Sequence, residues 1–332
     1  MSTIREIARA IGVSPTTVSR AMNGRGRLSL ETRQMVLQHI REAGFTPNAN
    51  AQRLAAGRTH VIALHLGDWP DVLSDMFMVE LVRGVQEALV KQGYGLLLST
   101  ENAMLQQWAN SRAIDGVILS IGRTPEEVFG MTTPGVPCVV IGHERLSGTQ
   151  GAGSVVIGSR NGVRQVARML VELGHRRIGY LGNAHTTNPV FLAFREELMS
   201  LGQTLPEERV VFVGNTLEDG ERGLITLLSR PDPPTALFAR TDTLAAGALR
   251  AARKLGLQVP RDLSLIGHDD VPFASLAEPP LTSVRINCPE LGRSATEMVL
   301  GLIQCPAHCP EPAVVHTELV LRESVAAPTV KW

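Results

Sequence analysis

Several polar side chains within one short segment near the N-terminus have the chemistry to contact nucleic acid. Apolar residues in this segment recur at helical spacing, so the polar residues fall together on the opposite side. These polar residues are Thr16, Thr17, Ser19, Arg20 and Asn23. Hydroxyl groups can hydrogen-bond to phosphates, and an arginine can donate two hydrogen bonds to a guanine in the major groove. The segment therefore predicts a helix that contacts duplex DNA, with an ordinary solvated helix face as the alternative.

Two further helices are needed to hold the polar helix in place. Apolar residues recur at helical spacing before it, at Ile4, Ile7, Ala8 and Ile11. Gly12 ends that first helix, while Ser14 and Pro15 are typical of the N-cap and first position of the next. A third helix is predicted between Ser29, as its cap, and Gly44. Together these features indicate a helix-turn-helix head, although an ordinary three-helix bundle would show the same pattern.

The charge of the chain is unevenly distributed. Basic and acidic residues each number 32 in the 332 residues, so the average is neutral. Residues 1–60, however, hold nine arginines and three glutamates, a net charge of +6, which leaves −6 on the remainder. A basic head on an acidic body favours an anionic partner for the head, although a solvated charged surface is compatible with the same asymmetry.

The head resembles the lac/galactose repressor family of bacterial transcription regulators over its whole length. The shared pattern comprises Gly12-Val13-Ser14-Pro15, Thr17-Val18-Ser19-Arg20, Asn23, Ser29-Leu30-Glu31-Thr32-Arg33, Gly44-Phe45-Thr46-Pro47-Asn48 and a segment that contains Leu54. The resemblance implies a helix-turn-helix DNA-binding domain over residues 1–46 and a hinge helix over residues 47–58. An isolated hinge this short is not a stable helix, so we expect it to fold only when two copies meet on DNA.

The resemblance also implies roles for individual residues on DNA. Thr16 and Arg20, with Pro15 beside them, match positions that read bases in the major groove. Positions that contact the DNA backbone are matched by Thr3, Ser14, Thr17, Ser19, Asn23, Ser29 and Asn48. Leu54, followed by Ala55, matches the hinge leucine that is wedged between base pairs in the minor groove. Such a wedge costs unstacking energy, which is offset because bent DNA contacts more of the protein.

From residue 59 onward, apolar strands alternate with helices. The predicted strands cover residues 60–66, 95–99, 115–119, 137–142, 177–182, 210–213, 236–239 and 263–267, with further strands near 314–315 and 319–321. Near-continuous apolar strands between helices predict parallel sheets covered on both faces. Two such sheets in succession indicate two lobes with a ligand cleft at the carboxyl ends of the strands. The fold class is therefore an all-α helix-turn-helix head followed by a two-lobed α/β domain.

This body resembles the effector domain of the same family, which is like a periplasmic sugar-binding protein. The shared stretches include Leu173-Gly174-His175, Gly267-His268-Asp269-Asp270 and Pro280-Leu281-Thr282-Ser283-Val284. The resemblance implies an N-terminal lobe of residues 59–159 and 287–314, and a C-terminal lobe of residues 160–286 and 315–325.

The resemblance places a small effector in the cleft and identifies Asp269 as an acceptor of hydrogen bonds from sugar hydroxyls. The family's second clamp is an arginine, which Val190 replaces here without a guanidinium's donors. The family's asparagine is replaced by Thr241, which Arg240 precedes. Three alternatives follow for the effector: a less polar or otherwise different molecule, an acidic or phosphorylated sugar bound by Arg240, or no small molecule at all.

Three residues after the first strand are candidates for the opposite wall of the cleft. They are Asp68, Trp69 and Phe77. Plain core packing is the alternative for Trp69 and Phe77, because large aromatic side chains are commonly buried.

Composition narrows the class of protein. No stretch approaches the ~18 apolar residues of a membrane helix, and the polar N-terminus has no secretory signal. Four cysteines are too few for a disulfide framework, so we expect a soluble cytoplasmic protein with reduced thiols. Cys305, His308 and Cys309 resemble metal ligands, but structural zinc requires four ligands. We therefore expect no metal and no cofactor.

These features predict a homodimeric, sequence-specific transcription regulator, a repressor of a carbohydrate-utilisation operon that responds to a sugar-like effector. Its partner would be palindromic double-stranded DNA, because twofold protein symmetry imposes twofold symmetry on the site. The alternative is a DNA-binding regulator that acts without an effector or under control of a protein partner. An enzyme is not expected, because His268-Asp269 shares its motif with no nucleophile or second catalytic carboxylate.

Overall fold

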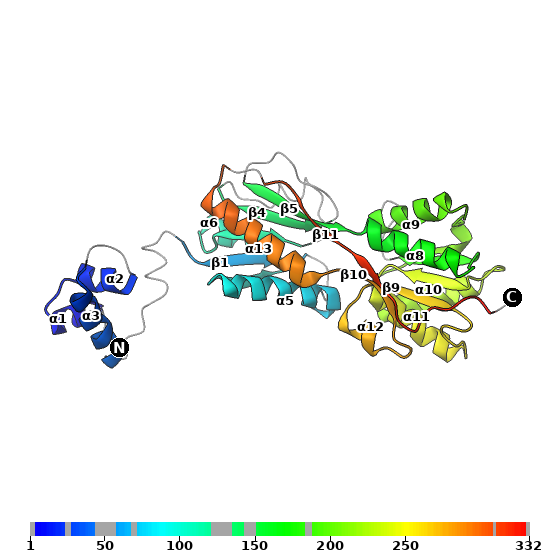
Figure 1. Cartoon of the computed structure of the whole chain (residues 1–332), viewed down its shortest axis with the longest axis horizontal. Helices are drawn as coiled ribbons and strands as arrows, with labels where there is room; N and C mark the ends of the chain where they lie inside the picture. The colour runs from blue at the N-terminus through cyan, green and yellow to red at the C-terminus, as the bar shows by residue number, and fades with distance from the viewer. Residues whose placement is uncertain are drawn as a thin grey trace. The chain divides into compact units, whose positions relative to one another are not determined.

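The structure is a computed structural model that describes residues 4–23, 28–43, 58–67, 72–120, 135–142, 151–182, 188–307 and 310–329. The chain separates into two compact units, Met1–Thr59 and His60–Trp332. The first unit contains the helical head, and the second contains the α/β body (Figure 1).

Three helices form the described part of the head: α1 (Ile4–Ala10), α2 (Pro15–Asn23) and α3 (Leu30–Glu42). Their apolar faces meet in one small core made of Ile7, Ala8, Val18, Ala21, Val36 and Ile40. Gly12 has a φ of +68° in the turn between α1 and α2, a conformation that glycine adopts without a steric penalty. The predicted helix-turn-helix is therefore confirmed, with its turn where the glycine allows it.

The N-terminal lobe of the body is built on a parallel sheet with the strand order β11-β5-β4-β3-β1-β2. The strands are β1 (Val61–His65), β2 (Gly95–Ser99), β3 (Gly116–Leu119), β4 (Cys138–Gly142), β5 (Ala152–Gly158) and β11 (Ala313–His316). The helices are η1 (Val72–Ser74), α5 (Met76–Lys91), α6 (Asn102–Asn110) and α13 (Cys288–Gln304). One core joins α5 and α13 to the sheet, and a second joins α6 to it, so the sheet is buried between helices (Figure 1).

The C-terminal lobe repeats this plan with the strand order β12-β10-β9-β8-β6-β7, in which only β12 is antiparallel to its neighbour. The strands are β6 (Ile178–Gly182), β7 (Val210–Phe212), β8 (Ala236–Ala239), β9 (Ser264–Asp269), β10 (Thr282–Arg285) and β12 (Glu318–Val320). The helices are α8 (Arg160–Glu172), α9 (Pro189–Ser200), η2 (Glu207–Arg209), α10 (Leu217–Leu228), α11 (Asp242–Lys254) and α12 (Pro272–Leu276). Separate cores under α8 and α9 and under α10 and α11 confirm the predicted two-lobed α/β class.

The chain passes between the lobes three times. The passages run from β5 to α8, from β10 to α13 and from β11 to β12. The predicted limit between residues 314 and 315 falls inside β11, because β11 pairs with β5 as far as His316. The other predicted domain limits stay predictions. Two strands, β5 and the largely buried β10, lie outside the strands predicted from the sequence.

Candidate functional site

Helix α2 has one side packed in the core of the head and a polar side that faces away from it. Val18 and Ala21 are fully buried in the core of the head. On the other side of the helix, Pro15, Thr16 and Arg20 are exposed. The helix contains no acidic residue that would repel a phosphate. A hydroxyl and a guanidinium can therefore enter a DNA groove from this helix without disturbing the core.

Two of the serines that match backbone-contacting positions cap helices. The Ser14 hydroxyl accepts a hydrogen bond from the backbone N–H of Thr17 at 3.0 Å and lies 2.9 Å from the Thr17 hydroxyl. The Ser29 hydroxyl accepts from the backbone N–H of Thr32 at 3.1 Å. Both serines are exposed, whereas Thr17 and Ser19 are half-buried. The capped N-terminus of α2 therefore lies at the surface, where backbone N–H groups and the helix dipole favour a phosphate.

The remaining predicted DNA contacts are not located by the structure. Thr3, Asn48, Leu54 and Ala55 lie outside the described residues, and Asn23 is placed only as the last residue of α2. Their roles on DNA stay predictions.

In the body, the carboxyl end of β9 turns sharply at two successive aspartates. Asp269 has a φ of +106° and Asp270 a φ of +55°, which residues other than glycine seldom adopt. Asp242, the first residue of α11, is 1% exposed and holds this turn. Its carboxylate accepts hydrogen bonds from the backbone N–H of Val271 at 2.8 Å and from the Ser283 hydroxyl at 2.7 Å. Asp269 is therefore held at the strand end by contacts from two other elements.

Asp269 forms a buried polar cluster with Arg240 and His268, which we call the strand-end cluster. Nδ1 of His268 lies 2.8 Å from Oδ1 of Asp269 and 3.3 Å from Nη1 of Arg240. The distance from Nη1 of Arg240 to Oδ1 of Asp269 is 3.7 Å. His268 is fully buried, and the Arg240 side chain is only 11% exposed.

Burial shifts the pKa values of Asp269 and His268 in this cluster. It raises the pKa of Asp269 well above its usual range, although the positive charge of Arg240 acts in the opposite direction. Burial and the charge of Arg240 together lower the pKa of His268 well below its usual range. The imidazole is therefore neutral at pH 7, and Arg240 is the cation of the cluster.

A chain of hydrogen bonds joins the two lobes near this cluster. One carboxylate oxygen of Asp75, the N-cap of α5, accepts from Nδ2 of Asn215 at 3.2 Å. The Thr241 hydroxyl donates to Oδ1 of Asn215 at 2.7 Å and accepts from the backbone N–H of Leu244, as the N-cap of α11. Burial raises the pKa of Asp75, and the charge of Arg240 opposes the shift. The N-terminal ends of helices from both lobes therefore meet within electrostatic reach of Arg240.

Two of the residues predicted for the cleft, Val190 and Phe77, are buried in hydrophobic clusters, and their contribution to effector binding stays a prediction. Val190 is fully buried in a cluster that includes Tyr180 and Phe194, where an apolar side chain gains most from leaving water. Phe77 is 6% exposed and packs in the core of the N-terminal lobe, as the core-packing alternative expects. The described effector candidates that the structure brings together are thus Arg240, Thr241 and Asp269. Asp68 and Trp69 lie outside the described residues, and their contribution stays a prediction.

Three polar residues of this region were not among the predicted effector residues: Asp75, Asn215 and His268. Asp75 carries a weak signal, because aspartate before an apolar helical pattern is a common N-cap. His268 lies inside the shared Gly267-His268-Asp269-Asp270 stretch, but its burial beside an arginine is a tertiary contact. Asn215 lies 140 residues from Asp75 along the chain, so nothing local indicates that they meet.

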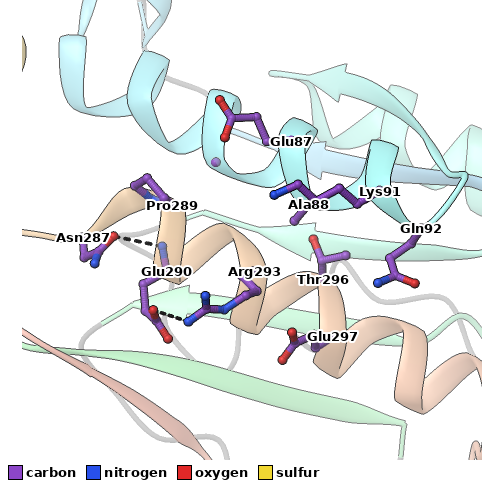
Figure 2. A pocket seen from close by; sticks show the side chains of 11 residues that line it. Glu87, Ala88, Lys91, Gln92, Asn287, Pro289, Glu290, Arg293, Thr296 and Glu297 are labelled. Carbon is purple, nitrogen blue, oxygen red and sulfur yellow. Dashed lines mark hydrogen bonds and ion pairs between the residues drawn. The ribbon is translucent and has the colours of Figure 1, made fainter.

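A hollow lies on the N-terminal lobe between α5 and α13 and has a volume of about 340 Å³ (Figure 2). Its charged lining residues are Glu87, Lys91, Glu290, Arg293 and Glu297. Thr296 also lines it, is 1% exposed, and has a hydroxyl without a hydrogen-bond partner among the described residues. Glu290 and Arg293 are paired with each other. The mixed charge of this wall favours no single class of ligand.

Within the described part of the chain, no group of three or more His, Cys, Asp and Glu side chains is arranged to hold a metal ion. Cys305 is exposed, and the other two candidate ligands, His308 and Cys309, lie outside that part. None of the described helices has both the length and the apolar character required to span a bilayer.

Comparison with known sequences matches both units of the chain. Residues 3–48 match the family described as bacterial regulatory proteins, lacI family, and residues 167–325 match a periplasmic binding protein-like domain. The HTH-type transcriptional regulator AglR of Rhizobium meliloti (strain 1021) is 32% identical over 97% of this chain and 93% of its own length. The similarity therefore extends through the head and the body alike.

Solved structures show the same fold. The lac repressor dimer bound to operator and the anti-inducer ONPF has a TM-score of 0.85 at 22% identity, covering 98% of this chain and 99% of its own. The complex of the transcriptional regulator CelR with cellobiose has a TM-score of 0.71 at 29% identity, covering 98% of this chain and 100% of its own.

Proposed function

This chain belongs to the lacI family of bacterial regulatory proteins, and from that premise we propose that it represses a carbohydrate-utilisation operon under control of a small, polyhydroxylated effector. The observation that carries the proposal is the joining, in one chain, of an exposed DNA-reading helix to a two-lobed domain with polar side chains at its strand ends. Such a regulator acts in the cytoplasm, where its DNA lies.

The head supports recognition of a specific DNA sequence. Thr16 and Arg20 are exposed on α2, and the α2 N-terminus is capped by Ser14. A helix of this kind lies in the major groove with its N-terminal residues against base edges. We propose that the protein acts as a homodimer, because two heads related by twofold symmetry match a palindromic operator. The lac repressor is a dimer on its operator, which supports this assembly.

The body supports control by a ligand between the lobes. The Asp75–Asn215 hydrogen bond joins the lobes beside Arg240, Thr241 and Asp269. A ligand that binds these groups more tightly in one lobe arrangement than in another shifts the population toward that arrangement. We propose that the shift reaches DNA through the hinge of residues 47–58, which is too short to be a stable helix by itself.

The test is a gel-shift titration of the full-length protein with DNA from its own promoter region, at low salt, with and without candidate effectors. We expect a discrete complex that competitor DNA of unrelated sequence does not displace at equal concentration, and an effector that changes its apparent Kd. Failure to bind any DNA from that region, with the protein folded by circular dichroism, would remove the proposed function.

Val190 supports a second candidate function, a DNA-binding regulator without a small effector. Its burial in the C-terminal core means that the position of the family's clamp arginine carries no polar group toward a ligand. Calorimetry with a panel of sugars, sugar acids and sugar phosphates separates the two candidates. Saturable binding of one compound that also changes operator affinity excludes the second candidate.

A further inference from the structure

Arg240 is a buried cation that uses few of its hydrogen-bonding groups. A guanidinium has five N–H donors. Among the described residues, Arg240 approaches a hydrogen-bond acceptor only through Nη1, which lies 3.3 Å from Nδ1 of His268. Its Nε–H is buried and has no partner among the same residues. A buried charge is costly unless it is paired and hydrogen-bonded, so the contacts around this side chain are incomplete.

The His268 nitrogen that contacts Arg240 also contacts a second group. Nδ1 of His268 also lies 2.8 Å from Oδ1 of Asp269. A single ring nitrogen either donates to the carboxylate or accepts from the guanidinium, and it cannot do both. The shorter distance favours the contact with Asp269. In that state Arg240 is attracted to Asp269 at 3.7 Å and makes no hydrogen bond to it.

The unused donors form one edge of the guanidinium. With Nη1 turned toward His268 and Asp269, the opposite edge consists of Nε and Nη2. Two parallel N–H groups on such an edge match the two oxygens of a carboxylate in a planar, bidentate pair. Three polar side chains lie beside Arg240 in sequence or in space: Thr241, Asn215 and Asp269. They supply hydrogen-bond acceptors and donors of the kind that bind hydroxyl groups.

We propose that the effector is a hydroxylated carboxylic acid, an aldonate or a uronate, whose carboxylate is bound by Arg240. The inference rests on the proposed function and adds the chemical class of its effector. In this arrangement, Arg240 supplies from the end of β8 the guanidinium that Val190 lacks on α9, while Asp269 accepts from the hydroxyl groups of the same ligand.

Charge balance favours a carboxylate over a phosphate. Arg240 is the cation whose charge acts on Asp75, Asp269 and His268 among the described residues. One guanidinium compensates a monoanion, whereas a phosphate monoester near neutral pH carries up to two charges. Among the described residues, no second cation acts on Asp75, Asp269 or His268 that could balance this other charge, and an unpaired charge is costly in a buried site.

The experiment is isothermal titration calorimetry of the full-length protein with a set of potassium hexonates and hexuronates of gluco, galacto and manno configuration. Each acid is paired with its neutral parent sugar and with the 6-phosphate of that sugar. The variants are Arg240→Gln, which removes the charge, and Arg240→Lys, which keeps the charge and loses the bidentate edge. Arg261→Gln is the matched control, because Arg261 is 59% exposed and pairs only with its neighbour Asp262 among the described residues.

We expect one acid to bind at least about tenfold more tightly than its parent sugar and its phosphate. Arg240→Gln should weaken the binding of that acid by about 10- to 100-fold, with a smaller loss of affinity for Arg240→Lys and none for Arg261→Gln. Equal affinity for acid and parent sugar overturns the proposal, as does preference for the phosphate, binding of no acid, or an acid affinity that Arg240→Gln leaves unchanged.

Gel shifts with operator DNA on the same protein samples distinguish failure of this inference from failure of the proposed function on which it rests. Specific operator binding together with control by a neutral sugar leaves the proposed function in place and overturns the acid effector. If the wild-type protein shows no specific operator binding, the proposed function itself is wrong.

Discussion

At the scale of single residues, Asp242 shows how a buried carboxyl group positions another. It fixes the turn that presents Asp269 and is itself almost fully buried. Burial, followed by the nearby charge of Asp269, raises the pKa of Asp242 well above its usual range. The folded protein therefore holds this proton more tightly than the unfolded chain does. The resulting stability is complete below the unfolded pKa, about 3.9, and is lost as pH rises through the folded pKa.

Replacing Asp242 by asparagine tests this linkage. Urea unfolding between pH 4.5 and pH 7.5 should show the wild-type free energy of unfolding falling with pH, with a contribution from Asp242 of up to about 1.4 kcal/mol per pH unit. The fall should be shallower in Asp242→Asn. Asp262→Asn serves as a control, because a hydrogen bond from Arg261 lowers the pKa of Asp262 and its effect lies at lower pH. A slope in Asp242→Asn as steep as in the wild type would contradict the assignment.

Arg20 provides a second test at the residue scale. It is exposed on α2, so Arg20→Ala should leave the head folded and remove a side chain that is predicted to read a base. We expect operator binding to weaken by about 10- to 100-fold, with a smaller loss on unrelated DNA. Gel-shift titrations on both DNAs measure the two effects, and Gln34→Ala, at an exposed position of α3, is the control. A proportional loss on both DNAs would show that Arg20 contacts only phosphates.

At the scale of elements, the crossing of α5 and α13 depends on two glycines. A Cβ atom at Gly84 would overlap the backbone carbonyl of Cys288, and one at Gly292 would overlap the backbone of Gly84. The two helices therefore pack backbone to backbone at this point. The hollow of Figure 2 lies between these same two helices.

Alanine substitutions on these helices should have opposite effects. Gly84→Ala must push the helices apart and should destabilise the body by about 2 kcal/mol or more. Gly301→Ala, on the same α13, meets nothing within 4 Å and should stabilise the protein by up to about 1 kcal/mol, because alanine favours the helix. Thermal and urea unfolding of the two variants measure both changes. Equal stability of Gly84→Ala and the wild type would show that the crossing is looser than described.

At the scale of the whole molecule, the proposed repressor must transmit a change in the body to the DNA. Leu54→Ala tests the hinge that the sequence predicts for this role. Removing the apolar wedge should weaken operator binding by roughly tenfold or more and affect unrelated DNA far less, because the wedge acts only on DNA bent at the operator centre. Fluorescence anisotropy with operator and scrambled duplexes measures both affinities, and an equal loss on the two would rule out the wedge.

The sequence alone determined the features that depend on neighbouring residues. Helical spacing in the head and the caps Ser14 and Ser29 are local, and the structure shows the expected helices and cap hydrogen bonds. Apolar runs likewise predicted most strands of both sheets within a residue or two. The strand β5 escaped prediction because small residues such as Gly153 give it a weak apolar pattern, and it is recognisable as a strand through its pairing with β4 and β11.

Only the tertiary structure decided which polar groups share a site. Val190 was expected at the cleft and lies in the core, while Asp75 and Asn215 join the lobes without any local signal. The ends of β8 and β9 bring Arg240 against His268 and Asp269 across 28 residues of chain. Parallel strands meet only after long crossovers are packed, so the neighbours of a strand-end residue, and with them its charge state, depend on contacts that sequence spacing does not encode.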